Sequence, residues 1–220
     1  MPGTSADGSI ERIPTDDPVV AGSAPVASAR KGRGAVSNLA HRFEAVQRSP
    51  DPDALAGEDE VLPPLATSVT FEAARSIITR NESPDIGFDR SVNPYRGCEH
   101  GCIYCYARPT HSYLNLSPGL DFETKLVAKR NAAELLLKEL AAPGYTPELI
   151  MVGANTDAYQ PVERELKITR GVREVLAAAR HPFGLVTKSS LIERDLDLVA
   201  AMARLDLASV SISITTLDAK

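Results

Sequence analysis

The sequence lacks any apolar run that approaches the roughly 18 consecutive residues needed to cross a bilayer, so we expect no membrane-spanning helix. Its N-terminus, Met-Pro-Gly-Thr-Ser, has neither the basic region nor the apolar stretch of a secretory signal peptide. An excess of basic residues is also absent, since the net charge is −5. This balance argues against a uniformly basic nucleic-acid-binding surface, though not against a local basic groove.

Cysteine is scarce, and its placement directs the prediction of function. The only three cysteines are Cys98, Cys102 and Cys105, at C-x3-C-x2-C spacing. Disulfide pairing would leave an odd thiol, and no secretory context supports it. A loop this short can bring all three sulfurs to one side. Three thiolate ligands are one fewer than a closed zinc site or an ordinary four-cysteine iron–sulfur cluster needs. A metal centre here would keep one coordination position free for a non-protein ligand.

Zinc is the alternative reading of the same residues. The three cysteines with His100 or His111 would supply a Cys3His ligand set. Zinc modules usually build their site from two separated ligand pairs, whereas here all cysteines fall in one loop, which favours a cluster. The zinc alternative is a nucleic-acid-binding module without catalysis, using the basic arm at Arg30–Arg42.

The residues around the cysteines resemble a known superfamily. The spacing, with the aromatic Tyr104 just before the third cysteine, is similar to the signature of the radical S-adenosylmethionine (radical SAM) superfamily. The longer run Ser91-Val-Asn-Pro-Tyr-Arg-Gly-Cys-Glu-His-Gly-Cys-Ile-Tyr-Cys-Tyr-Ala-Arg-Pro-Thr-His111, with Asp121-Phe-Glu-Thr-Lys125 after it, resembles the spore photoproduct lyase-like branch. The resemblance covers roughly residues 75–220.

The resemblance implies an enzyme whose three cysteines, here Cys98, Cys102 and Cys105, hold a 4Fe–4S cluster with S-adenosylmethionine on its open iron. Reductive cleavage of the sulfonium would yield a 5′-deoxyadenosyl radical that abstracts hydrogen from a substrate. The branch suggests a lyase or repair-type reaction on a nucleic-acid lesion or another nucleotide-derived target. Such chemistry needs an external electron donor, flavodoxin- or ferredoxin-like. An oxygen-sensitive cluster and free thiols both fit a reducing cytoplasm.

Composition divides the chain into two regions. Residues 1–65 are rich in Pro, Gly, Ser, Ala and Asp without a sustained apolar period, which predicts a disordered, low-complexity arm and linker. Within it, the basic stretch Ala29–Glu44 is either an arm that touches nucleic acid or folds back onto the domain, or a solvated tail. Residues 66–220 are predicted to form the radical SAM core domain.

Strands and helices alternate along that core. A short element of either type is expected over Thr70–Thr79. The expected strands are Phe88–Asn93, Thr124–Lys129, Leu149–Val152, Phe183–Thr187 and Leu207–Ile214. Helices are expected to begin at Asn131, capped with Glu134, to run over Glu165–Arg180, and to begin at Ser190, capped with Glu193. This alternation predicts right-handed βαβ units in a parallel sheet or barrel.

The expected fold class is therefore α/β, as a partial parallel (β/α) barrel of the radical SAM type, similar to a TIM barrel. The sequence ends at Lys220, and a complete barrel of this type would need about two more βα units. We expect a chain truncated after about four βα units, with its C-terminal part missing. A poorly folded, inactive fragment with exposed strand edges is a further reading.

Cofactor ligands are expected beyond the carboxyl ends of the strands, where parallel α/β folds bind them. Asn155, Thr156 and Asp157 follow one strand and take the place of the superfamily's Gly-Gly-Glu motif, although the letters differ. Lys188 follows the next strand and suits the carboxylate of S-adenosylmethionine. Equally, Asp157 could cap a turn and Lys188 could be solvated.

Three further residues are assigned to the cofactor. Ser211 and Ser213 share a face of the last strand and could reach the ribose, or could only pack against small neighbours. Tyr104 resembles the aromatic residue whose backbone meets adenine in the superfamily. Spore photoproduct lyase-like chemistry could use a further, catalytic cysteine as hydrogen donor, and the sequence has none beyond the three. Either Tyr106 or Tyr159 substitutes, the donor lies outside this sequence, or the reaction differs.

Overall fold

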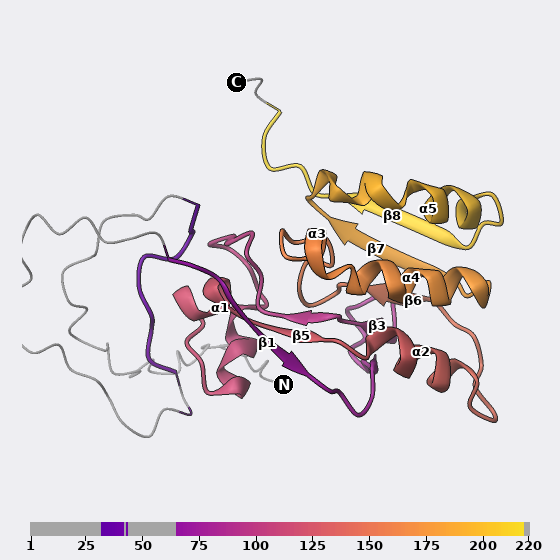
Figure 1. The fold of residues 1–220 in the computed structure, drawn as a ribbon, viewed down its shortest axis with the longest axis horizontal. Coiled ribbons are helices and arrows are strands. Elements are labelled where there is room, and N and C mark those ends of the chain that lie inside the picture. The colour runs from indigo at the N-terminus through magenta and orange to yellow at the C-terminus, as the bar shows by residue number, and fades with distance from the viewer. Residues whose placement is uncertain (1–31, 42, 44–64, 218–220) are drawn as a thin grey trace, which may run out of the picture.

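The computed structural model describes residues 32–41, 43 and 65–217. Figure 1 shows its elements along the chain. They are β1 (Ser68–Glu72), β2 (Ile78–Arg80), β3 (Arg90–Val92), β4 (Tyr95–Arg96), the 3-10 helix η1 (Arg108–Leu114), α1 (Leu120–Thr124), β5 (Lys125–Lys129), α2 (Ala132–Leu140), β6 (Ile150–Val152), α3 (Glu163–Leu166), α4 (Ile168–Ala178), β7 (Phe183–Thr187), the 3-10 helix η2 (Ser190–Asp195), α5 (Leu196–Ala203) and β8 (Ala208–Ile212).

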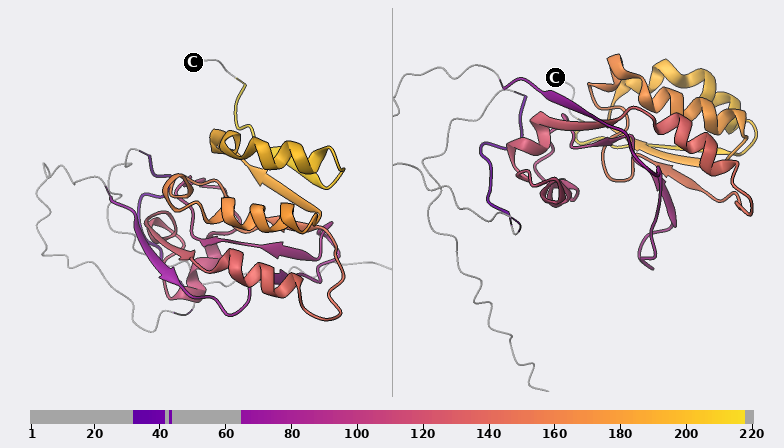
Figure 2. Two further views of the ribbon diagram at one scale, coloured as in Figure 1. Left: turned by 45° about the vertical axis from the view of Figure 1, so that its right-hand side comes forward. Right: turned by 60° about the horizontal axis from the view of Figure 1, so that its bottom comes forward.

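The larger sheet has the strand order β2-β3-β6-β7-β8. Strands β3, β6, β7 and β8 are parallel, and β2 joins the edge antiparallel to β3. Helices α2, α4 and α5 lie side by side on one face of this sheet (Figures 1 and 2). The alternation of strands and helices therefore predicted the mixed α/β class and the parallel pairing correctly, and the described strands form an open sheet.

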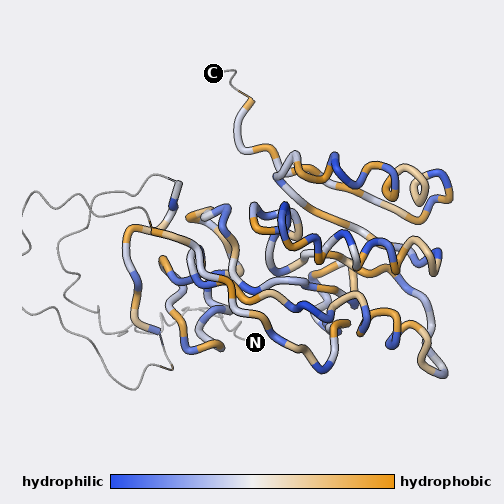
Figure 3. Tube along the Cα trace, in the orientation of Figure 1, coloured by the Kyte–Doolittle hydropathy of each residue, from blue (hydrophilic) through white to orange (hydrophobic). Residues whose placement is uncertain are grey.

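The register separates the two faces of the sheet. The row that faces the helices is apolar and consists of the partners Val92, Val152, Leu185 and Val210. Neighbouring residues point the opposite way, because side chains alternate along a strand. That row consists of Ser91, Met151, Gly184 and Ser209. Hydrophobic and hydrophilic residues also alternate along α2, α4 and α5 (Figure 3), so one stripe of each helix covers the apolar row.

A second sheet corrects the expected place of one strand. The sequence predicted a strand over Thr124–Lys129, and β5 forms there, but in a separate sheet of order β1-β5-β4. It pairs parallel with β1 and antiparallel with β4. The expected single element over Thr70–Thr79 is also wrong, since that stretch contains the end of β1 and the start of β2.

Helix starts differ from the predicted caps. Asn131 makes no capping hydrogen bond; its side-chain amide instead pairs with the backbone of Ala74 at 3.0 and 2.9 Å. Ser189, rather than Ser190, caps the next helical segment by accepting from Leu191. The helix predicted over Glu165–Arg180 is divided at Lys167, whose φ of 52° is left-handed. Local sequence patterns therefore found these helices and the position of Asn131 before α2, but not the contacts at the helix starts.

The N-terminal segment (residues 32–41) is packed against the domain, which corrects part of the expected disordered arm. The backbone amide of Leu120 donates to Ser37, and the Asn38 side chain exchanges hydrogen bonds with Asp121 at 3.0 and 2.9 Å. Of the two functional readings of the basic stretch, folding back onto the domain is the one observed here. Arg30, Lys31 and Arg42 lie outside the described residues.

Within the part of the chain that the structure describes, no helix combines the length and apolar character needed to cross a bilayer.

Candidate active site around the cysteine loop

The cysteine loop (Cys98–Cys105) follows β4 and consists of successive tight turns. The amide of Gly101 donates to Cys98 at 3.4 Å, and that of Cys105 donates to Cys102 at 3.2 Å. Cys98 is buried, whereas Cys102 and Cys105 are half-buried. Burial raises the pKa of the Cys98 thiol to about 12, so a thiolate there requires a nearby cation, such as a metal centre, to stabilise it.

Two glycines allow the loop to approach the helix beneath it. Gly97 has a φ of 77° and Gly101 a φ of 62°, which is the left-handed region that favours glycine. A Cβ on Gly101 would lie 2.8 Å from a carboxylate oxygen of Glu123, and one on Gly97 would lie 2.8 Å from Leu126. The loop therefore sits directly on residues of α1 and β5.

The two histidines that the zinc alternative needs, His100 and His111, lie beside other residues. Three thiolates on one zinc ion lie within about 4 Å of one another, because each Zn–S bond is about 2.3 Å. Across residues 32–41, 43 and 65–217, no group of three or more His, Cys, Asp or Glu side chains is placed to hold one metal ion. His111 is buried against Phe122, with ring centroids 5.5 Å apart, and His100 lies beside Asp157. A 4Fe–4S cluster spreads its thiolates over separate irons, and three thiols on one loop suit that need.

Lys188 joins the end of β7 to the cysteine loop. Its ammonium lies 2.8 Å from the sulfur of Cys102 and 5.6 Å from the ring centroid of Tyr104. Burial alone would lower the pKa of Lys188, but Cys102, Tyr104 and Asp157 together raise it. The sequence predicted Lys188 as a cofactor contact, and the structure brings it to the cysteines.

Asp157 connects the loop after β6 to the end of β7. Its carboxylate accepts from the Thr187 hydroxyl at 2.7 Å and from the Lys188 amide at 3.1 Å, and it lies 3.3 Å from the His100 ring. Burial alone would raise the pKa of Asp157, but these donors lower it. Protein groups therefore contact both carboxylate oxygens, and Asp157 links the ends of two strands to the cysteine loop.

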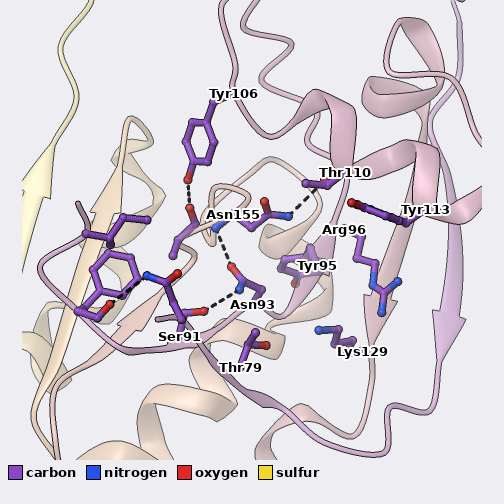
Figure 4. Close-up of a pocket in the computed structure, with 14 residues that line it drawn as sticks. Thr79, Ser91, Asn93, Tyr95, Arg96, Tyr106, Thr110, Tyr113, Lys129 and Asn155 are labelled. Carbon is purple, nitrogen blue, oxygen red and sulfur yellow. Dashed lines mark hydrogen bonds between the residues drawn. The ribbon is translucent and has the colours of Figure 1, made fainter. Parts of the chain in front are cut away.

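Asn155 and Thr156 face different surroundings. The Asn155 amide nitrogen lies 3.4 Å from the Thr110 hydroxyl, and its side chain lines an open pocket (Figure 4). Thr156 is buried and donates to the carbonyl of Tyr95 at 3.1 Å. Asn155 is therefore accessible to a ligand, whereas the Thr156 hydroxyl fastens the loop to β4.

The remaining predicted cofactor residues are exposed. Ser211 lies on β8 opposite Val186, and Ser213 follows the strand, with its amide donating to Thr187 at 2.8 Å. Tyr104 is 67% exposed beside Lys188. The structure brings Tyr104, Asp157 and Lys188 together at the cysteine loop, while Ser211 lies on the edge strand β8 and Ser213 directly after it.

A buried carboxylate, missed in the sequence, supports the loop from below. Glu123 is fully buried and accepts from Arg108 at 2.5 Å, from Gly34 at 3.0 Å and from Ala35 at 2.8 Å. Arg108 also donates to the carbonyl of Cys102 at 2.9 Å. In the sequence this glutamate stands out only as part of Asp121-Phe-Glu-Thr-Lys125, and nothing in that run predicts its burial.

The two tyrosines considered as hydrogen donors are now distinguished. Tyr159 is fully buried in the core, where its hydroxyl donates to Asp195 at 2.7 Å and accepts from Arg173. Burial and these two partners argue against Tyr159 as the hydrogen donor among the alternatives that the sequence left open. Tyr106 is 76% exposed, and its hydroxyl donates to the carbonyl of Ala154 at the pocket (Figure 4).

Comparison with known proteins assigns the family. The chain matches the radical SAM superfamily over residues 92–220, which is more than half of its length, so it belongs to that superfamily. Members of the superfamily are enzymes that typically use a 4Fe–4S cluster and S-adenosylmethionine. The cysteine loop, β6, β7 and β8 all fall inside the matched range.

Individual relatives are similar over shorter parts of their own chains. Uncharacterized protein Rv2578c of Mycobacterium tuberculosis and Uncharacterized protein Mb2609c of Mycobacterium bovis are each 39% identical over 158 residues, 70% of this chain and 46% of theirs. Uncharacterized protein MJ0683 of Methanocaldococcus jannaschii is 31% identical over 107 residues, 49% of this chain and 38% of its own. The chain spans about half the length of the mycobacterial relatives. No solved structure matches it.

Proposed function

We propose that this chain carries the cofactor site of a radical SAM enzyme, in which Cys98, Cys102 and Cys105 hold a 4Fe–4S cluster. The observation that supports it most strongly is the position of the cysteine loop at the carboxyl ends of β6 and β7, where Asp157 and Lys188 contact it. A cluster held by these cysteines would supply the electron for reductive cleavage of S-adenosylmethionine, and so the radical that would abstract hydrogen from substrate.

The protein groups bind and orient the cofactor. Lys188 places a positive charge beside the Cys102 sulfur, where it offsets thiolate charge and is available to the cofactor carboxylate. Asn155 offers an accessible amide, Ser211 and Ser213 offer hydroxyls on the uncovered strand edge, and Tyr104 presents its backbone and ring beside Lys188. Asp157 and Thr156 hold the loops in place.

The finer assignment is to the spore photoproduct lyase-like branch, with a lyase or repair-type reaction on a nucleic-acid lesion or nucleotide-derived substrate in the cytoplasm. The run from Ser91 to His111 supports the branch. A partial barrel is supported by four parallel strands with helices on one face. We include an external flavodoxin- or ferredoxin-like donor, because this chain has no cysteines beyond the three for a second cluster.

Anaerobic reconstitution with iron and sulfide, followed by Mössbauer and EPR spectroscopy, tests the proposal. We expect a 4Fe–4S signal that changes when S-adenosylmethionine is added, because the cofactor would bind the open iron. Stoichiometric zinc without a 4Fe–4S signal, together with salt-sensitive nucleic-acid binding, would instead support the zinc module.

A further inference from the structure

Lys129 is a buried cation without a close partner. It ends β5, is 8% exposed and lines the pocket beside the cysteine loop. Within the described part of the chain, its ammonium makes neither a hydrogen bond nor an ion pair. Burial, and then the nearby Arg96, lower the pKa of Lys129, although Glu72 opposes the change. Keeping an unpaired ammonium in such a place costs stability, so an anion supplied from outside would find a ready partner.

Arg96 brings a second cation to the same pocket. It lies on β4 opposite Val127, a neighbour of Lys129 on β5, and both cations line the pocket (Figure 4). The only ion pair of Arg96 among described residues is with Glu72, at 3.6 Å. The described lining of the pocket contains these two cations and no carboxylate, so the pocket carries a net positive charge.

The rest of the pocket suits an organic ligand. Its volume is about 380 Å³. Polar side chains of Ser91, Asn93, Thr110 and Asn155 line it together with Tyr106 and Tyr113 (Figure 4). Tyr106 directly follows Cys105 in sequence, so the pocket borders the cysteine loop. A ligand anchored at the two cations would extend past amides and aromatic rings toward that loop.

We propose that this pocket binds the substrate through an anionic group, a phosphate or a carboxylate, held by Lys129 and Arg96. The role of the ligand as substrate rests on the proposed function; the anion site itself rests on the two cations. Arginine binds such oxyanions through a planar fork and lysine as a point charge, so the pair matches either group.

The test is calorimetric titration of the 220-residue chain, before and after cluster reconstitution, with inorganic phosphate and separately with acetate. Lys129→Met and Arg96→Gln should each weaken binding of the preferred anion by about tenfold, the loss expected for one charge-assisted contact. Lys138→Met, which removes an exposed lysine on α2, should leave binding unchanged. Tighter binding of phosphate or of acetate identifies which anionic group the pocket takes.

Thermal unfolding separates binding from a structural role. Without anion, Lys129→Met should be at least as stable as the wild type, because it removes a desolvated charge. The proposal is overturned if neither anion binds, if both variants bind as the wild type does, or if S-adenosylmethionine displaces the anion, which would assign the pocket to the cofactor. Failure of cluster reconstitution with anion binding retained would overturn the proposed function but not the anion site.

Discussion

The ammonium of Lys188 lies 2.8 Å from the sulfur of Cys102, so the end of β7 contacts the cysteine loop through a charged side chain. The backbone of the same residue donates to Asp157, which also lies beside His100 of the loop. One residue thus links a strand of the sheet, the loop after β6 and a proposed cluster ligand. Changing its side chain removes the charge but leaves the backbone link in place.

Replacing Lys188 by Ala should weaken cofactor binding without removing the cluster. Lys188 is not itself a ligand, so the absorption near 400 nm, roughly where iron–sulfur charge transfer falls, should persist. Binding of S-adenosylmethionine should weaken by about 1–3 kcal/mol, the contribution of one ion-mediated contact. Titration with EPR detection measures this, and Lys138→Ala on the exposed side of α2 is the control. Unchanged cofactor affinity would remove Lys188 from the site.

Replacing any one of Cys98, Cys102 or Cys105 by Ala should abolish the cluster. An iron left without its thiolate binds water or is lost, so each change removes the site and does not merely weaken it. Iron content and absorption near 400 nm, roughly the charge-transfer region, measure the result. A single cysteine variant that retains the full 4Fe–4S signal would show that the replaced residue is not a ligand.

The sequence predicted where strands form better than which strands pair with one another. The run Phe183–Thr187 became β7 with the same bounds, and four of its five residues are buried, whereas Val186 is exposed on the face without helices. Thr124–Lys129 was also a strand, but alternation with helices does not state which sheet a strand joins. Its pairing with β1 and β4 depends on contacts that are distant in sequence, and these have no local signature.

The sequence predicted where two residues of the candidate site lie, but not the contacts of others. Lys188 and Asp157 were chosen because they follow strands whose carboxyl ends must meet, and the structure places both at the cysteine loop. Glu123 was missed, since its partners Gly34 and Ala35 come from about ninety residues earlier in a stretch predicted to be disordered. The low apolar content of that stretch predicted disorder. Composition carries no information on which backbone amides a buried carboxylate will bind.

His181 should make stability fall in mild acid. Its Nδ1 donates to the Pro182 carbonyl at 3.0 Å, which leaves Nε2 to accept from the Tyr145 hydroxyl at 2.7 Å. Burial, together with nearby Arg90, lowers the pKa of His181 below its ordinary 6.5, although the Pro182 carbonyl opposes this. The unfolded chain therefore takes up the proton first. The stabilising contribution of neutral His181 in the folded protein is complete above about pH 6.5 and is lost as the pH falls below that value.

Chemical denaturation at about pH 7.5 and about pH 5.5 measures this effect. The wild type should lose more unfolding free energy between the two pH values than His181→Gln, because glutamine does not titrate. An equal loss in both proteins would show that His181 does not contribute to the pH dependence.

Glu123→Gln should loosen the cysteine loop and the N-terminal segment together. The fully buried carboxylate binds Arg108, which holds the Cys102 carbonyl, and the amides of Gly34 and Ala35. Removing its charge leaves the guanidinium poorly paired, so the free energy of unfolding should fall by about 2–4 kcal/mol.

Gly34→Ala should have a comparable effect, because its new Cβ would lie 1.7 Å from the carbonyl oxygen of Gly101 and the segment would have to detach. If both changes act by releasing the same segment, the double variant should lose less than the sum of the two. Denaturant unfolding measures the energies, with the exposed Glu134→Gln as control, and strictly additive losses would show that the two residues act independently.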